Sequence, residues 1–200
     1  MIENIIFDFG DIFINLDKEI VFREMQNQGV PTLNPEILSL SLAFEVGEIS
    51  PQTFVGGLKS SFPKATSEQI ITIWNGMLLD FPDYRLDFLE KLAKENKYRL
   101  FLLSNTNALH IPEVVNIMGD SNYNRFKNSF EQFYLSHEIH LRKPNADIFE
   151  FVLSENNLNA SETLFIDDTL ENTEAADKLG INTWNLIVGK EDIIDLKTKL

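Results

Sequence analysis

The stretch Ile5-Ile6-Phe7-Asp8-Phe9-Gly10-Asp11 decides the fold and points to where its chemistry lies. Its first residues form a short apolar run that is typical of a buried strand, and Gly10 ends that run. Asp8 therefore stands at the carboxyl end of a buried strand, where a carboxylate is costly unless it has a partner. In open α/β sheets, ligands bind at that end of the strands. The alternative is an acid that caps the following turn, a common place for Asp.

Three further polar segments follow Asp8 at wide intervals. Ser104-Asn105-Thr106-Asn107 and Asp167-Asp168 each end an apolar run, and Lys143-Pro144 lies between them. Together with Asp8 they supply a nucleophilic carboxylate, a hydroxyl and amide cluster, a cation and a second acidic pair. That set suits phosphoryl transfer through an aspartyl-phosphate with a magnesium ion.

Each segment also has a purely structural interpretation. The run that begins at Ser104 could cap the next helix, or its hydroxyl and N–H groups could cradle a phosphate. Lys143, next to Arg142, could be part of a solvated basic pair, or it could balance the charges of Asp8 and a phosphate. The adjacent acids Asp167 and Asp168 repel each other, and Mg²⁺ would resolve that repulsion.

Composition narrows the class of protein. The chain has 200 residues, 44% of them hydrophobic, which fits one α/β domain or a core with a modest insertion. The net charge of −14, without a basic cluster, argues against nucleic acid and anionic membranes as partners, but allows a small phosphorylated ligand. The chain has no cysteine and only three histidines, so we expect no zinc site. No leader or membrane-spanning run is recognisable, so we expect a cytoplasmic protein, a monomer or weak dimer.

Hydrophobic periodicity predicts strands that alternate with helices. The expected strands are residues 4–9, 99–104, 130–135, 163–167 and 181–187, and the expected core helices are 84–96, 146–155 and 171–179. This alternation predicts an α/β fold with a parallel sheet covered on both faces.

A helical block interrupts this alternation after the first strand. Its predicted helices are 18–28, 35–46, 51–61 and 67–78, with start signals at Asn34-Pro35, Ser50-Pro51 and Ser67. We therefore expect a core of residues 1–16 and 84–200 with an inserted helical domain of residues 17–83.

At this point the chain resembles the haloacid dehalogenase-like hydrolase superfamily over nearly its whole length. Phe7-Asp8-Phe9-Gly10 looks like the first family motif, Leu103-Ser104-Asn105 like the second and Arg142-Lys143-Pro144 like the third. Phe165-Ile166-Asp167-Asp168 through Asn172 looks like the fourth. The resemblance implies a Rossmann-like core with a small, mobile helical cap.

The resemblance also implies roles for these residues. Asp8 would attack phosphorus, while Ser104 and Lys143 would hold the phosphoryl group, with Asn105 beside them. Asp8, Asp168 and the backbone carbonyl of Gly10 would bind magnesium. Asp167 would be a second ligand or a supporting acid. Asn172 fills the place of the polar residue that the family pairs with its metal-binding Asp, which ranks Asp168 above Asp167 as direct ligand.

One departure is the Gly10 position, where phosphatases of the superfamily usually carry a general acid–base Asp. Such catalysis contributes about 10²–10⁴ in rate. Dehalogenases also lack that Asp, but they use no magnesium and do not keep the acidic pair. The chain further resembles a subgroup, with Gly at this position, that includes a sugar-1-phosphate phosphatase. Whether Asp11, His110 or the leaving group compensates stays open.

The inserted helices would then select the substrate. Candidates are Glu45 and Glu48 around Gly47, as acceptors of sugar hydroxyls, and also Trp74 and Asn75. The leading hypothesis is a magnesium-dependent phosphatase of small phosphorylated metabolites such as sugar phosphates. The rivals are a 2-haloacid dehalogenase, a catalytically silent phosphate-ligand binding protein and a phosphomutase.

Overall fold

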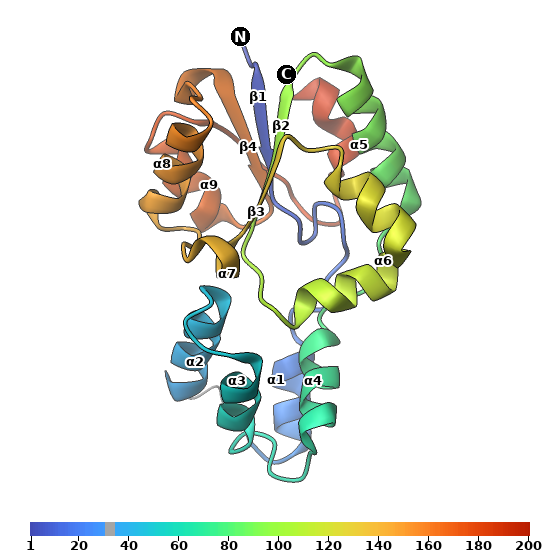
Figure 1. The fold of residues 1–200 in the computed structure, drawn as a ribbon, viewed down its shortest axis with the longest axis vertical. Helices are drawn as coiled ribbons and strands as arrows, with labels where there is room; N and C mark the ends of the chain where they lie inside the picture. Colours follow the sequence, from blue (N-terminus) through green and yellow to red (C-terminus); the bar gives the residue numbers. More distant parts are fainter. Residues whose placement is uncertain (31–34) are drawn as a thin grey trace.

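A five-stranded parallel sheet forms the centre of the molecule. The computed structural model describes residues 1–30 and 35–200, and its strand order is β3-β2-β1-β4-β5 (Figure 1). Phe7 of β1 pairs with Leu102 of β2 on one side and with Ile166 of β4 on the other. The strands are β1 (Asn4–Phe7), β2 (Arg99–Ser104), β3 (Gln132–Leu135), β4 (Thr163–Asp167) and β5 (Asn182–Asn185).

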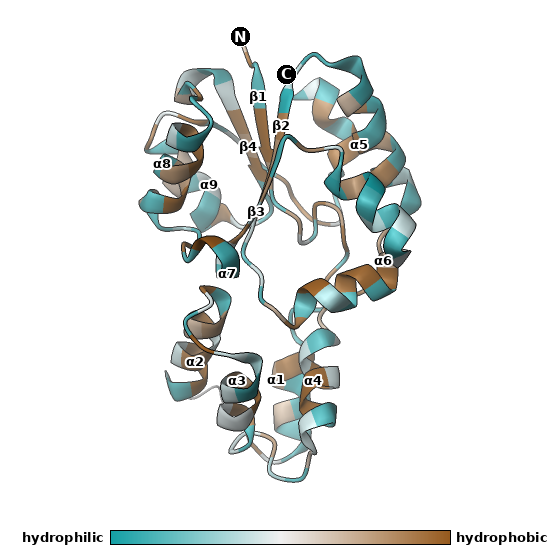
Figure 2. Cartoon of the chain, viewed as in Figure 1, coloured by the Kyte–Doolittle hydropathy of each residue, from teal (hydrophilic) through white to brown (hydrophobic). Residues whose placement is uncertain are grey.

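Side chains alternate between the two faces of the sheet and so feed two apolar clusters. Ile5 and Phe7 face the cluster that includes α5 (Asp83–Glu95) and α6 (His110–Lys127). Ile6 faces the cluster that includes α8 (Ala146–Glu155) and α9 (Leu170–Asp177). Figure 2 shows the hydrophobic colouring of β1, β2 and β4 between these two helical layers. A parallel sheet covered on both faces was expected and is confirmed.

In the described part of the chain, four helices form a separate lobe with an apolar cluster of its own. They are α1 (Ile20–Asn27), α2 (Pro35–Glu45), α3 (Pro51–Leu58) and α4 (Ser67–Asn75). Phe44 and Phe54 stack at 4.2 Å in this helical lobe. Both chain termini lie at the opposite end of the molecule (Figure 1). The domain boundaries at residues 16/17 and 83/84 stay a prediction.

Two segments connect the lobe to the core, and they lie side by side. The N–H of Asn15 donates to the Asp80 carbonyl at 3.0 Å, and that of Leu79 donates to the Asn15 carbonyl at 2.9 Å. Arg85 at the start of α5 donates to the Asn15 side chain at 3.0 Å, and it pairs with Asp192 at 2.9 Å. Asp192 caps the short helix η2 (Ile193–Thr198). The lobe therefore has a fixed point of attachment.

Most predicted elements have slightly shorter counterparts in the structure. The Ser50 hydroxyl accepts a hydrogen bond from Thr53 N–H as the cap of α3, as expected, whereas α4 is capped by Thr66 rather than by Ser67. The Asn34 cap lies outside the described residues. Helix α6 was not predicted, because Pro112, Gly119 and the Asn-rich stretch after it are poor helix formers. Gly119 indeed interrupts it, with φ +73°.

In the described part of the chain, no helix combines the length and apolar character needed to cross a bilayer.

Candidate active site

The carboxyl ends of β1, β2 and β4 bring three predicted residues to one edge of the sheet. Asp8 directly follows β1, Ser104 ends β2 and Asp167 ends β4. All three side chains are buried. Lys143 joins them from the loop between the short helix α7 (Ser136–Ile139) and α8. The structure thus assembles residues that span most of the sequence.

Lys143 is the centre of this cluster. Its side chain is 1% exposed, and its Nζ donates to Asp8 Oδ1 and to Asp167 Oδ2, both at 2.7 Å. Burial lowers the pKa of Lys143, but the charges of the two carboxylates outweigh it and raise the pKa above its ordinary value. Burial raises the pKa of Asp8 to about 7, although Lys143 opposes that rise. Lys143 is therefore a buried ammonium and not a solvated base.

The two adjacent acids have different surroundings. Asp167 is fully buried, and its oxygens accept hydrogen bonds from the Asn172 amide at 3.1 and 3.0 Å and from Thr169 N–H at 2.8 Å. Asn172 was expected to support Asp168, so its partner differs from the expectation. It reaches Asp167 because both lie on the buried side of the turn into α9. With Lys143 added, Asp167 is saturated.

Asp168 instead faces the open side of the site. It lines a pocket with Asp8, Lys143 and Lys18. Burial raises its pKa, although Lys18 opposes the shift. Lys18 Nζ lies 2.5 Å from Asp168 Oδ2 and 2.9 Å from Asp11 Oδ2. The sequence offered no signal for Lys18, which comes from the segment that leads into the lobe.

Three carboxylates converge closely enough to hold one cation. One oxygen each from Asp8, Asp167 and Asp168 lie within 4.8 Å of one another. Carboxylate oxygens are hard donors, which magnesium prefers. The donor set therefore fits Mg²⁺, and two of its members, Asp8 and Asp168, line the adjoining pocket.

The second predicted motif holds the Lys143 loop in place. The Asn105 amide donates to the Lys143 carbonyl at 2.9 Å and its oxygen accepts from Lys143 N–H at 3.0 Å. Among the residues that the structure describes, Ser104 Oγ has only a long contact of 3.5 Å, with the Asn105 carbonyl. Its hydroxyl is therefore available to a ligand.

Gly10 leaves no acid at the position where the family usually has one. A Cβ at Gly10 would lie 2.7 Å from Leu16 Cδ1 and 3.9 Å from Asp8 Oδ2. Asp11, the next residue, adopts φ +54°. Its carboxylate accepts from Leu16 N–H at 3.0 Å and pairs with Lys18. The Asp11 carboxylate is thus occupied by Leu16 and Lys18.

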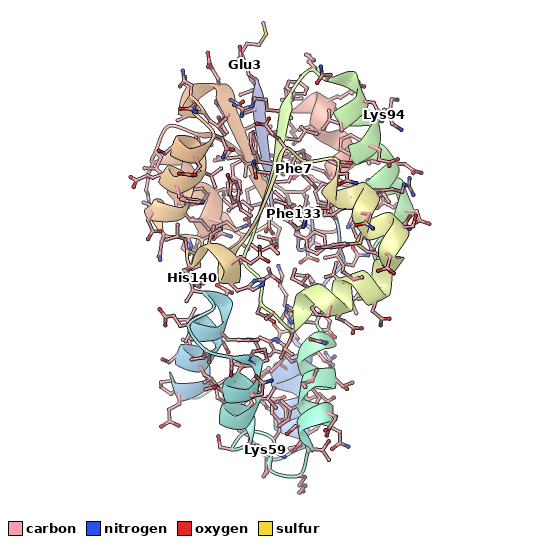
Figure 3. The ribbon with its side chains drawn as sticks, in the orientation of Figure 1. Glu3, Phe7, Lys59, Lys94, Phe133 and His140 are labelled. Carbon is pink, nitrogen blue, oxygen red and sulfur yellow. The ribbon has the colours of Figure 1, made fainter. Side chains whose placement is uncertain are left out.

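The helical lobe also contacts the core through the end of α2, which the sequence did not predict. The Ser136 hydroxyl lies 2.7 Å from the Glu45 carbonyl, and His140 Nδ1 lies 2.8 Å from the Val46 carbonyl. Arg142 donates to the Glu45 carboxylate at 2.6 Å. These donors satisfy carbonyls that a helix end leaves free. Figure 3 shows His140 at this junction.

This arrangement defines a class of protein: a parallel α/β core with an inserted helical lobe, and an acidic site with a buried lysine at the carboxyl edge of the sheet. The family model of haloacid dehalogenase-like hydrolases matches residues 5–186. The chain therefore belongs to this family, and the resemblance of its four motifs is confirmed.

Two curated relatives are phosphatases. A D-ribitol-5-phosphate phosphatase of Bacteroides thetaiotaomicron is 27% identical over 192 residues, which cover 92% of this chain and 91% of the relative. A sesquiterpene phosphatase of Aspergillus oryzae is 28% identical over 138 residues, or 69% and 67% of the two chains.

Solved structures agree with the fold. A family enzyme of Bacteroides thetaiotaomicron in complex with magnesium is 34% identical, with a TM-score of 0.83 and coverage of 95% and 96%. The same enzyme was also crystallised with magnesium and inorganic phosphate. A haloacid dehalogenase of Xanthobacter autotrophicus, at 16% identity and a TM-score of 0.59, shares only the fold.

Proposed function

We propose that this protein is a magnesium-dependent phosphatase of small sugar or polyol phosphates, with Asp8 as nucleophile. The observation that carries the proposal is the buried Lys143 between Asp8 and Asp167, next to the Asp168 carboxylate that lines the same pocket as Asp8. This grouping pairs a nucleophile with a cation that can hold a phosphoryl group and with a site for a divalent ion. The similarity to a D-ribitol-5-phosphate phosphatase supports the substrate class.

Asp8, Asp168 and the Gly10 carbonyl would hold magnesium. Asp167 would support them through its bonds to Lys143 and Asn172. When bound, the ion would offset negative charge on the phosphoryl group and favour the ionised form of Asp8.

The proposed reaction has two steps. An Asp8 carboxylate oxygen forms a bond to phosphorus while the bond from phosphorus to the leaving-group oxygen breaks, and that oxygen takes a proton from solvent water. Water then attacks the phosphorus of the aspartyl-phosphate, which releases inorganic phosphate and restores Asp8. Lys143 Nζ and the Ser104 hydroxyl would bind the phosphoryl oxygens in both steps.

This site has Gly10 at the position where the family usually carries its proton donor. Asp11 is engaged with Leu16 and Lys18, so the proposal does not use it as the acid. Without a positioned acid, the rate of phosphate-ester cleavage can fall by about 10²- to 10⁴-fold. We therefore expect turnover below that of relatives that carry an Asp at the Gly10 position.

Phosphate release from a panel of phosphorylated sugars and polyols, with Mg²⁺ or with chelator, tests the proposal. We expect release that requires Mg²⁺ and that Asp8→Asn abolishes. Release that persists in chelator or in Asp8→Asn would contradict it. Chloride release from 2-chloropropionate without metal would favour a dehalogenase, and ligand-induced thermal stabilisation without turnover would favour a silent binding protein.

Two further predictions accompany the proposal. A cytoplasmic location and a monomer or weak dimer stay expectations, the second of which sedimentation would test. The net charge of −14 supports a small phosphorylated ligand over nucleic acid or a membrane surface.

A further inference from the structure

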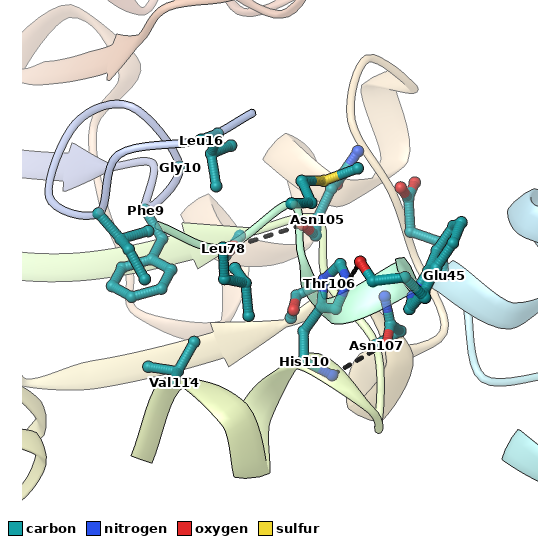
Figure 4. Close-up of a pocket in the computed structure, with 14 residues that line it drawn as sticks. Phe9, Gly10, Leu16, Glu45, Leu78, Asn105, Thr106, Asn107, His110 and Val114 are labelled. Carbon is teal, nitrogen blue, oxygen red and sulfur yellow. Dashed lines mark hydrogen bonds between the residues drawn. The ribbon is translucent and has the colours of Figure 1, made fainter. Parts of the chain in front are cut away.

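A second pocket adjoins the carboxylate site and lies between the lobe and the core. Its lining includes Trp74 and Glu45 from the lobe and His110 from the core (Figure 4). Gly10 and Asn105 line both this pocket and the one that contains Asp8. A ligand whose phosphoryl group lies at Asp8 would therefore extend toward His110.

His110 is held rigidly in this pocket. Its backbone N–H donates to the Asn107 side chain at 3.1 Å at the start of α6. Its ring stacks on the Trp74 indole, with 5.5 Å between ring centroids and 23° between planes. The residue is only 7% exposed. Since Trp74 belongs to the lobe, the ring position depends on the lobe lying against the core.

The hydrogen bonds of the ring define which nitrogen carries the proton. His110 Nε2 lies 3.4 Å from the Trp74 carbonyl oxygen, and a carbonyl can only accept, so Nε2 is the N–H. Burial lowers the pKa of His110 to about 4, so the ring is neutral at neutral pH. Nδ1 then carries a free lone pair. No protein donor to Nδ1 exists within residues 1–30 and 35–200.

Because His110 lines the pocket, a ligand hydroxyl there can donate to the free lone pair of Nδ1. Glu45 adds a second acceptor to the lining, and the Trp74 indole N–H is a buried donor without an acceptor among the described residues. Hydroxyl groups can both donate and accept, whereas alkyl groups can do neither. The pocket therefore matches a hydroxylated leaving group better than an alkyl one.

We propose that His110 is a specificity-determining residue whose Nδ1 accepts a hydrogen bond from a hydroxyl of the leaving group. This inference rests on the proposed phosphatase function and assigns part of its substrate selection to one atom. It gives His110 no role as proton donor, since its free nitrogen has no proton to give.

The test compares two esters and two variants. One ester is the sugar or polyol phosphate that the panel ranks first, and the other is the alkyl phosphate of equal carbon number. For D-ribitol 5-phosphate the match is 1-pentyl phosphate. His110→Phe keeps a ring to stack on Trp74 but removes the acceptor. His110→Asn loses the ring but can place an amide oxygen near the position of Nδ1.

We expect His110→Phe to lower kcat/KM for the hydroxylated ester by about 5- to 100-fold. This is the range expected when a substrate hydroxyl in the pocket is left without its hydrogen-bond acceptor. The alkyl ester should change by less than about threefold, and His110→Asn should recover part of the loss. Equal losses on both esters, or no loss on the hydroxylated one, would overturn the inference and leave the phosphatase function standing. Wild-type protein that releases phosphate from neither ester would overturn the proposed function itself.

Discussion

Lys143 and Asp8, 135 residues apart in the chain, form a buried ion pair of 2.7 Å. Lys143→Met would leave Asp8 facing Asp167 without a cation. We expect the free energy of unfolding to fall by about 3 kcal/mol at pH 8, the usual scale for removing one partner of a buried pair.

The loss should be smaller at pH 5. Burial raises the pKa of Asp8 to about 7, so the folded protein binds more protons than the unfolded chain between pH 3.8 and 7. A protonated Asp8 does not repel Asp167. Urea unfolding at both pH values measures this difference, with Lys18→Met, whose side chain is 47% exposed, as the control. Equal losses at the two pH values would contradict the prediction.

Substitution of Asp168 and of Asp167 should have different effects on Mg²⁺ binding and on stability. Asp168→Asn should weaken Mg²⁺ binding at least tenfold in calorimetric titration, because Asp168 lines the open pocket. Asp167→Asn should mainly lower the melting temperature, because Asp167 accepts from Lys143, Asn172 and Thr169. A larger loss of Mg²⁺ affinity in Asp167→Asn would reverse this assignment.

Lys18 should oppose metal binding. Its ammonium lies 2.5 Å from Asp168 and would repel a divalent cation there. We expect Lys18→Met to bind Mg²⁺ about two- to tenfold more tightly, with the difference shrinking at high salt. Lys59→Met in the helical lobe is a matched control for loss of one charge. Weaker binding in Lys18→Met would show that Lys18 instead orders the site.

Gly47 should be needed for docking of the lobe. It has φ +71°, and a Cβ there would lie 2.2 Å from the His137 carbonyl oxygen. Gly29 has φ +83° with nothing within 4 Å of a Cβ, so it shares the backbone strain without the clash. We expect Gly47→Ala to lower kcat/KM at least tenfold and Gly29→Ala to change it little. Similar kcat/KM values in the two variants would argue against the docking role.

The contribution of the buried His110 to stability should fall in mild acid. Its folded pKa of about 4 lies below the ordinary 6.5, so protonation of His110 favours the unfolded chain and its contribution to stability falls between pH 6.5 and 4, opposite in sign to that of Asp8. By pH 4.5 the His110 penalty is about 2–3 kcal/mol. Denaturant unfolding of wild type and His110→Phe should show a smaller acid loss in the variant. Parallel pH profiles would mean that His110 is not buried in neutral form.

The sheet and the location of the site were predictable because Asp8, Ser104 and Asp167 each follow an apolar run. In a parallel sheet, the carboxyl ends of such runs meet at one edge. Lys143 depended on the family resemblance, since a Lys-Pro pair alone is most often solvated. The structure shows it buried, with both of its acidic partners in reach.

The contacts of the lobe were not predictable from local pattern. Ser136 contacts the Glu45 carbonyl, and Gly47 lies against the His137 carbonyl, in each case across the junction between lobe and core. No spacing in the sequence relates the residues of these pairs. The expected link from Asn172 to Asp168 was wrong because the turn into α9 directs the amide to Asp167. Such pairings depend on the tertiary arrangement, which a single sequence leaves open.

The paired segments at Asn15 and Leu79 have a consequence for how such a chain can change during evolution. The chain leaves the core and returns to it at adjacent points. The whole helical lobe is therefore a single insertion between two neighbouring backbone positions of the core. A longer, shorter or unrelated insert could join the same two ends without moving a strand. The lobe, with its proposed share in recognising the leaving group through Trp74 and Glu45, can thus be exchanged as a unit, while the core that is proposed to bind the phosphate is retained.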